Sequence, residues 1–176
     1  MTHVTSRPGT LPRRSFLAAA AAAAVTLLGL AGCGFELRKA PVFAFKSLAV
    51  PGRSAMAAYV RRNMAAAGTV TIVPEAQAAT AEAVLDILGE TRDRVVVSTN
   101  SAGEVRELNV RLTIRFRLRT PAGKELLTSE IQQRRDVTYN ETNALAKDAE
   151  IELLYRDMQT DIAQQILRRL AAVKEL

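Results

Sequence analysis

Between Leu108 and Arg119 the sequence alternates strictly between apolar and polar residues. The apolar residues are Leu108, Val110, Leu112, Ile114, Phe116 and Leu118, and the polar ones are Asn109, Arg111, Thr113, Arg115, Arg117 and Arg119. A period of two is that of a β-strand, in which successive side chains point to opposite faces. The segment therefore predicts a long strand with one buried face and one polar face.

Turn residues on both sides of this segment predict its neighbours in a sheet. Asn100-Ser101-Ala102-Gly103 follows the run Val95–Thr99, and Pro121-Ala122-Gly123-Lys124 precedes a weaker alternating segment, Leu127–Tyr139. Short turns of this kind join antiparallel strands. We therefore predict an antiparallel meander, with a further strand over Val84–Leu88.

Two other segments have the spacing of amphipathic helices. Ser54 is a suitable N-cap for a helix that runs to Ala67, and Gly68 is a suitable end. From Ala144 to Ala172 apolar residues line one stripe without interruption by Gly or Pro. The sequence thus predicts an α+β fold, a two-layer sandwich of an antiparallel meander sheet packed against two amphipathic helices.

Residues 1–32 have the parts of an export signal. Arg13 and Arg14 supply positive charge, and the uncharged run Phe16–Ala31 is shorter than the ~20 apolar residues that a membrane-spanning helix needs. We therefore predict a cleaved signal peptide over 1–32, by the Sec or the twin-arginine route. Residues 33–176 would then form a single domain.

The signal ends in Leu30-Ala31-Gly32-Cys33, which resembles the lipobox of bacterial lipoproteins. In a lipobox the cysteine receives diacylglycerol and becomes the first mature residue, and several acyl chains anchor a protein durably. Gly34, in place of an aspartate, points to the outer membrane. The alternative is an ordinary signal peptide with an incidental cysteine.

The remaining chain has few groups with catalytic chemistry. The only histidine, His3, lies within 1–32, which excludes a histidine base, a catalytic triad and a histidine-ligated metal in the mature chain. The pairs Glu104/Glu107 and Glu150/Glu152 lack the aromatic platform of a glycosidase, since tryptophan is absent. We expect no enzymatic activity, no cofactor and no metal.

Positive charge is concentrated rather than general. Of 24 basic and 18 acidic residues, Arg7, Arg13 and Arg14 precede Cys33, so the mature chain has 21 against 18. Four arginines, Arg111, Arg115, Arg117 and Arg119, share the polar face of the alternating strand, where side chains two residues apart lie about 7 Å apart. This row could hold phosphates, or it could be a solvated face paired with acids on neighbouring strands. The small excess and the exported location argue against nucleic acid and leave lipopolysaccharide as the available polyanion.

Two segments resemble the LptE family of lipopolysaccharide-assembly lipoproteins. They are Cys33-Gly34-Phe35-Glu36-Leu37-Arg38, and Asn143-Ala144-Leu145-Ala146-Lys147-Asp148 with the helix that follows it. The resemblance covers the whole mature chain and implies a non-enzymatic role at the outer membrane. Family members plug the LptD β-barrel in a one-to-one complex, assist its assembly and help deliver lipopolysaccharide to the outer leaflet.

The resemblance also implies which residues meet lipopolysaccharide. Lys147 matches a basic residue in the loop that leads into the helix. At the hairpin tip Ser101-Ala102-Gly103 lacks the basic residue that some relatives have, and Arg106 could substitute for it. The full set of expected contacts to lipopolysaccharide or the barrel is Lys147, Arg106, Arg111, Arg115, Arg117, Arg119 and Arg135.

Two other functions stay open at this point. An accessory lipoprotein of an ABC-type intermembrane lipid transporter would share the anchor and the domain but would not partner a barrel. A periplasmic glycan-processing enzyme would depend on Glu104 or Glu150.

Overall fold

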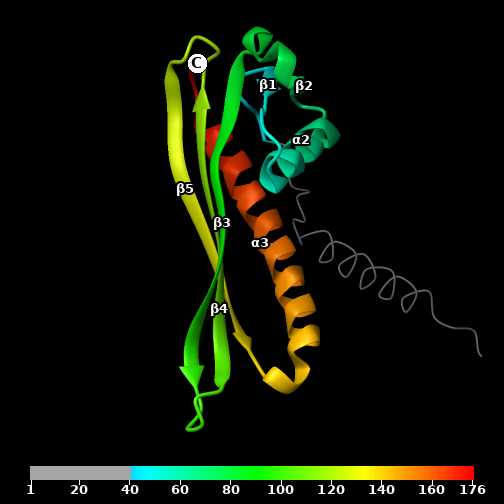
Figure 1. Cartoon of the computed structure of the whole chain (residues 1–176). Helices are drawn as coiled ribbons and strands as arrows, with labels where there is room; N and C mark the ends of the chain where they lie inside the picture. The colour runs from blue at the N-terminus through cyan, green and yellow to red at the C-terminus, as the bar shows by residue number, and fades with distance from the viewer. Residues whose placement is uncertain (1–40) are drawn as a thin grey trace, which may run out of the picture. The chain divides into compact units, whose positions relative to one another are not determined.

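Five strands form one sheet in the order β2-β1-β3-β4-β5, and two α-helices pack against it in residues 41–176, which are those that the computed structural model describes (Figure 1). The predicted signal peptide and Cys33 lie outside the described residues. The elements in chain order are β1 (Ser47–Ala49), α2 (Ala55–Ala67), β2 (Thr71–Val73), the 3₁₀ segment η1 (Glu75–Thr80), β3 (Ala83–Thr99), β4 (Val105–Arg119), β5 (Glu125–Thr138), the 3₁₀ turn η2 (Glu141–Asn143) and α3 (Ala144–Ala172).

Strands β3, β4 and β5 form the predicted antiparallel meander. The turns at both ends use glycine where the backbone φ is positive, at Gly103 (82°) and Gly123 (95°). The apolar runs Val84–Leu88 and Val95–Thr99 belong to one continuous strand, β3, because the polar stretch between them also pairs with β4.

The sheet is only partly antiparallel, which corrects the sequence-based prediction. β1 pairs in parallel with both β2 and β3. Parallel neighbours need a crossover connection, and α2 supplies it between β1 and β2. These two strands are only three residues long, so the sequence has no alternating pattern there that would indicate a strand.

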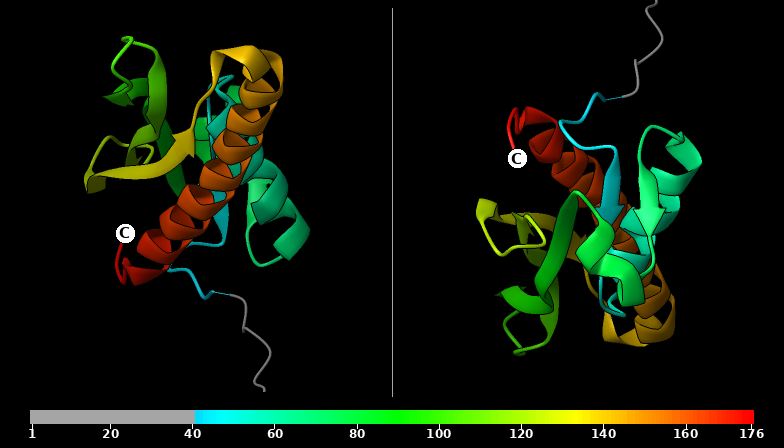
Figure 2. Two further views of the ribbon diagram at one scale, coloured as in Figure 1. Left: turned by 90° about the horizontal axis from the view of Figure 1, so that it is seen from below. Right: turned by 90° about the horizontal axis from the view of Figure 1, so that it is seen from above.

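The two predicted helices are confirmed, and one hydrophobic core joins them to the sheet. The Ser54 hydroxyl accepts from the Ala57 N–H at 3.0 Å, and Gly68 ends α2 at a φ of 65°. The views along the long axis show the sheet curving around α3, with α2 on the side of α3 away from β5 (Figure 2). The six apolar side chains of β4 lie in this core, where β4 packs against α3, and buried residues of α2 belong to the same core.

A bulge in β3 decides what faces the N-terminal half of α3. Register with β4 shifts between Ile87 and Gly89, so that Leu88 is an extra residue and is exposed. One inserted residue sends all following side chains to the opposite face. Arg92 and Arg94 consequently face α3 rather than the uncovered side of the sheet. No helix of residues 41–176 has the length and apolar character to span a membrane.

Candidate functional site

The predicted arginine row lies on the uncovered face of the sheet, and two of its members share one carboxylate. Arg119 Nε and Arg117 Nη2 donate to Asp86 Oδ2 at 2.7 and 3.1 Å. Burial acts to raise the pKa of Asp86, but the hydrogen bonds from Arg119 and Arg117 outweigh it, and the net pKa is lowered. Asp86 therefore remains ionised and neutralises part of the row.

The other two arginines are held differently. Arg111 Nε donates to Asn109 Oδ1 at 2.6 Å, and the Asn109 amide donates to Asp136 at 2.5 Å. Arg115 lies across Gly89, where an added Cβ would be 3.3 Å from Nε and Nη2 of the guanidinium. Arg115 is exposed and has no ion pair within residues 41–176.

Acidic residues occur opposite this row at several positions. The strand register places Asp93 opposite Arg111 and Glu130 opposite Arg115. The uncovered face is therefore a surface of mixed charge, with Arg115 as its most accessible cation in the row.

Arg135 lies apart from the row, on the face of β5 that meets α3. Its Nη2 is 2.9 Å from Asp161 Oδ2 of α3, and its Nη1 donates to Gln133. The structure thus separates Arg135 from the four arginines with which it was grouped and gives it a contact between sheet and helix.

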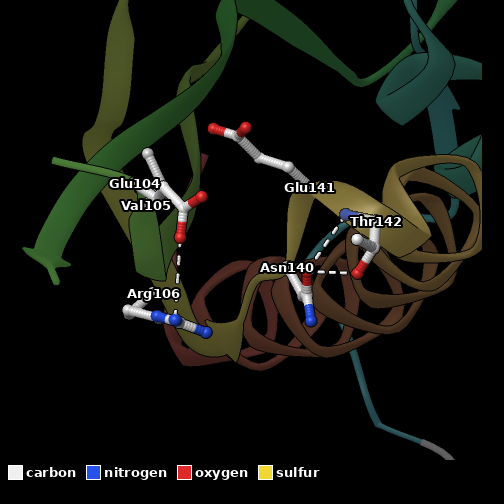
Figure 3. A pocket seen from close by; sticks show the side chains of 6 residues that line it. All are labelled: Glu104, Val105, Arg106, Asn140, Glu141 and Thr142. Atoms are coloured by element: carbon white, nitrogen blue, oxygen red, sulfur yellow. Dashed lines mark hydrogen bonds and ion pairs between the residues drawn. The ribbon is translucent and has the colours of Figure 1, made fainter. Parts of the chain in front are cut away.

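A pocket of about 420 Å³ opens where the start of β4 meets the connection from β5 to α3 (Figure 3). Its lining residues are Glu104, Val105, Arg106, Asn140, Glu141 and Thr142. Arg106 Nη2 is 3.7 Å from Glu104 Oε2, and the Asn140 side chain accepts from the Thr142 N–H and hydroxyl. The pocket is polar, open and of mixed charge.

The first turns of α3 continue this end of the molecule. Lys147 Nζ is 2.8 Å from Glu150 Oε2, and Leu145 is 89% exposed. A shallower pocket of similar volume runs from Glu141 to Ala146 beside it. Arg106 and Lys147, the two residues singled out by resemblance, therefore lie on elements that meet at one end of the molecule, which we call the hairpin end (Figure 1).

Sequence reasoning missed a polar network that ties β3 to α3 above this pocket. Arg94 contacts Asp148 at 2.7 Å, Arg92 contacts Glu152 at 3.2 Å, and Arg92 lies 4.9 Å from the ring centroid of Tyr155. The Tyr155 hydroxyl donates to the Asp93 carbonyl at 2.9 Å. Burial, the largest cause, raises the pKa of Tyr155. The only sequence signal was the charged stretch Thr91–Arg94 between two apolar runs.

The part of the chain that the structure describes supplies cations and hydrogen-bond donors, but it has no cluster of metal-binding side chains. Among residues 41–176 no group of three or more His, Cys, Asp or Glu is placed to hold a metal ion. The exposed arginines and lysines of these residues can form ion pairs with anionic groups.

Comparison with known proteins gives the family. The profile of the LptE lipopolysaccharide-assembly family matches residues 45–170, which run from just before β1 almost to the end of α3. The chain belongs to the LptE family. The predicted resemblance is thereby confirmed, although its first segment, Cys33–Arg38, precedes the matched residues.

Solved structures agree with membership of the LptE family. An uncharacterized lipoprotein B from Nitrosomonas europaea is 30% identical, with a TM-score of 0.66, and the match covers 79% of this chain and 91% of that one. The rare lipoprotein B from Shewanella oneidensis is 26% identical, with a TM-score of 0.61 and coverage of 72% and 94%. A minor lipoprotein from Acinetobacter baumannii, 21% identical with a TM-score of 0.57 and coverage of 73% and 92%, shares the fold.

Proposed function

We propose that this protein is a non-enzymatic outer-membrane lipoprotein, acylated at Cys33, that plugs the LptD β-barrel, assists its assembly and helps deliver lipopolysaccharide to the outer leaflet. The observation that carries the proposal is the family match over residues 45–170, which spans every strand of the sheet and nearly all of α3. The similar solved proteins are themselves lipoproteins.

The uncovered sheet face suits contact with the wall of a barrel. The interior of a large outer-membrane barrel is polar, and a face that carries both arginines and carboxylates can pair with either sign of charge on that wall. Arg115 is the member of the row best placed for this, since it is exposed and has no acidic partner within the described residues.

The hairpin end suits contact with the phosphates of lipopolysaccharide. Arg106 and Lys147 each have an acidic neighbour, at 3.7 and 2.8 Å. Exposed ion pairs contribute only about 0–1 kcal/mol, whereas arginine binds phosphate with two parallel hydrogen bonds. A phosphate group can therefore displace Glu104 from Arg106 at small cost.

The barrel proposal is tested by purifying the acylated protein from detergent-solubilised outer membranes. We expect a one-to-one complex with a heat-modifiable β-barrel. An Arg115→Glu variant should yield less barrel, whereas Arg168→Glu, an exposed charge reversal on α3, should not. Recovery of components of an inner-membrane ABC transporter without a barrel would contradict the proposal.

The lipopolysaccharide proposal is tested separately on the folded protein with purified lipopolysaccharide. Reversing both Arg106 and Lys147 to Glu should weaken binding by about tenfold or more, because two phosphate contacts are lost. The matched control reverses Arg168 and Lys174, which are exposed near the other end of α3. Equal binding by both double variants would show that the hairpin end is not the contact.

A further inference from the structure

One edge of β3 carries backbone groups that no described strand pairs with. β3 pairs with β4 over its whole length, but with β1 only at Ala83 and Val84. After Val84, no other strand of residues 41–176 pairs with β3 on the side opposite β4. A free edge presents a row of N–H and C=O groups that can pair with another extended chain. The protein thus has a strand-addition edge that its own fold leaves open.

Neighbouring elements define how much of this edge is usable. The carboxylate of Glu90 accepts from the Met56 N–H at 3.1 Å, so α2 approaches β3 there. A second register shift lies between Val96 and Ser98. Between these limits Thr91–Val96 pairs regularly with β4, and we call this stretch the β3 edge. Tyr155 donates to the Asp93 carbonyl, but a carbonyl oxygen has a second lone pair.

The side chains at the lower end of the β3 edge favour pairing. Val95 and Val96 are 39% and 50% exposed, although β-branched residues of this kind usually pack against neighbours in a sheet. Natural edge strands are commonly protected by lysine or proline, and the run Val95–Thr99 has neither. Three consecutive charges occur on both edges, Arg92, Asp93 and Arg94 on the β3 edge and Arg134, Arg135 and Asp136 on β5, so the uncharged valines mark the part of β3 most suited to pairing.

A second copy of this chain is a poor occupant of the β3 edge. Two copies of the same edge would pair as antiparallel strands related by a two-fold axis perpendicular to the sheet. Directly opposite residues must lie on the same face of the sheet, so one residue of the strand lies opposite its own copy. The longest self-pairings within Thr91–Val96 are centred on Asp93 or Arg94, and the central residue would lie opposite its own copy. Like charges directly opposite each other destabilise a sheet. A strand from a different protein has no such conflict.

We propose that the β3 edge receives an extended segment of the barrel partner as an added strand, an inference that rests on the proposed function. Main-chain hydrogen bonds would give affinity, and side-chain pairs would give register. The segment would place apolar or β-branched residues opposite Val95 and Val96. It would place a basic residue opposite Asp93, which has no ion pair within residues 41–176.

Amide hydrogen exchange of the purified complex and of the unbound protein tests this directly. Outward N–H groups of the β3 edge should exchange about tenfold or more slowly in the complex, because a partner strand satisfies them. Amides of the β5 edge serve as the internal control and should change less. If the barrel co-purifies while the β3 edge keeps its unbound exchange rates, the inference is wrong and the proposed function stands.

Proline substitution provides a second test. Successive N–H groups of a strand point to opposite sides, so one of Val95→Pro and Val96→Pro removes an outward N–H and spares the pairing with β4. That variant, identified by its retained circular dichroism, should recover about tenfold less barrel. The matched control is the pair Gln132→Pro and Gln133→Pro on the β5 edge. One of these two variants should also fold, and it should recover the normal amount of barrel.

The remaining outcomes each overturn the inference. If the folded proline variant of the β3 edge recovers as much barrel as the folded variant of the β5 edge, the β3 edge is not used. If the unbound protein sediments as a dimer that the β3 proline abolishes, a second copy occupies the edge. If unmodified protein recovers no barrel, the proposed function fails and the inference fails with it.

Discussion

Asp86 illustrates at the scale of single residues how a row of like charges is tolerated on a sheet. Its carboxylate bridges Arg117 and Arg119, so two neighbouring cations share one anion. The side chain of Asp86 is only 16% exposed, and a hydrogen bond between charged groups contributes more when it is shielded from water. The arginine row is therefore stabilised by a carboxylate of β3 and not by solvation alone.

Replacing Asp86 with Asn should lower the free energy of unfolding by about 1–3 kcal/mol at neutral pH. The folded-state pKa of Asp86 is lowered from its ordinary value of 3.8, so the stabilisation is fully present above that value and is lost as pH falls through the lowered pKa. Urea denaturation from pH 7 to pH 2 measures this. If the free energy of unfolding falls more steeply with decreasing pH in D86N than in the parent protein, Asp86 does not supply this stabilisation.

Strand β3 shows at the scale of elements how one extra residue redirects a charged segment. Without the extra Leu88, a regular register would send Arg92 and Arg94 to the uncovered face, beside the arginine row. The bulge turns both toward α3, where Asp148 and Glu152 pair with them. It therefore keeps two further arginines off the surface that carries the arginine row, and it ties the start of α3 to β3.

Removal of the Arg94–Asp148 pair should loosen the start of α3 more than it destabilises the protein. Both side chains are about half exposed, so a double-mutant cycle of R94A and D148A should give about 0.2–1 kcal/mol of coupling. Exchange of amides in 144–150 should become faster, while amides around Ile162 remain unchanged. Equal acceleration at both places would mean that the pair supports the whole core.

The hydrophobic core is unevenly distributed over the whole molecule. Residues 97–107 of the hairpin and 144–150 of α3 contain no buried residue. Farther along β4, by contrast, Leu112, Ile114 and Phe116 are fully buried in the core that β4 shares with α3. Segments with few buried contacts open at low free energy. We therefore expect the end of the molecule proposed to meet lipopolysaccharide to open at low free energy.

Truncation of core and hairpin side chains should reproduce this gradient. Leu112→Ala leaves a cavity in the core and should cost about 2–5 kcal/mol, whereas Val97→Ala, at a side chain 55% exposed, should cost less than about 0.5 kcal/mol. Chemical denaturation of the two variants measures the difference. Similar losses would mean that the hairpin end contributes to the cooperative core.

The sequence predicted those elements in which a regular apolar pattern continues over many residues or a capping residue marks the end. The helices over Ala55–Ala67 and Ala144–Ala172 and the strand around Leu108–Arg119 have such signals. The parallel strands have only three residues each, and a bulge leaves no mark in a sequence until its partner strand is known. The partners of the arginines depend on register, so Asp86 and Asp148 could not be assigned to them beforehand.

The hydrogen bond from Tyr155 to the Asp93 carbonyl also gives the molecule an optical reporter. The sequence has three tyrosines and no tryptophan, so near-ultraviolet absorbance and fluorescence come largely from tyrosine. Tyr155 is the one whose hydroxyl bridges α3 and β3. Burial raises the pKa of Tyr155, so its hydroxyl should ionise at a higher pH as long as α3 stays in contact with β3. Separation of the two elements can therefore be followed by spectroscopy without attaching a dye.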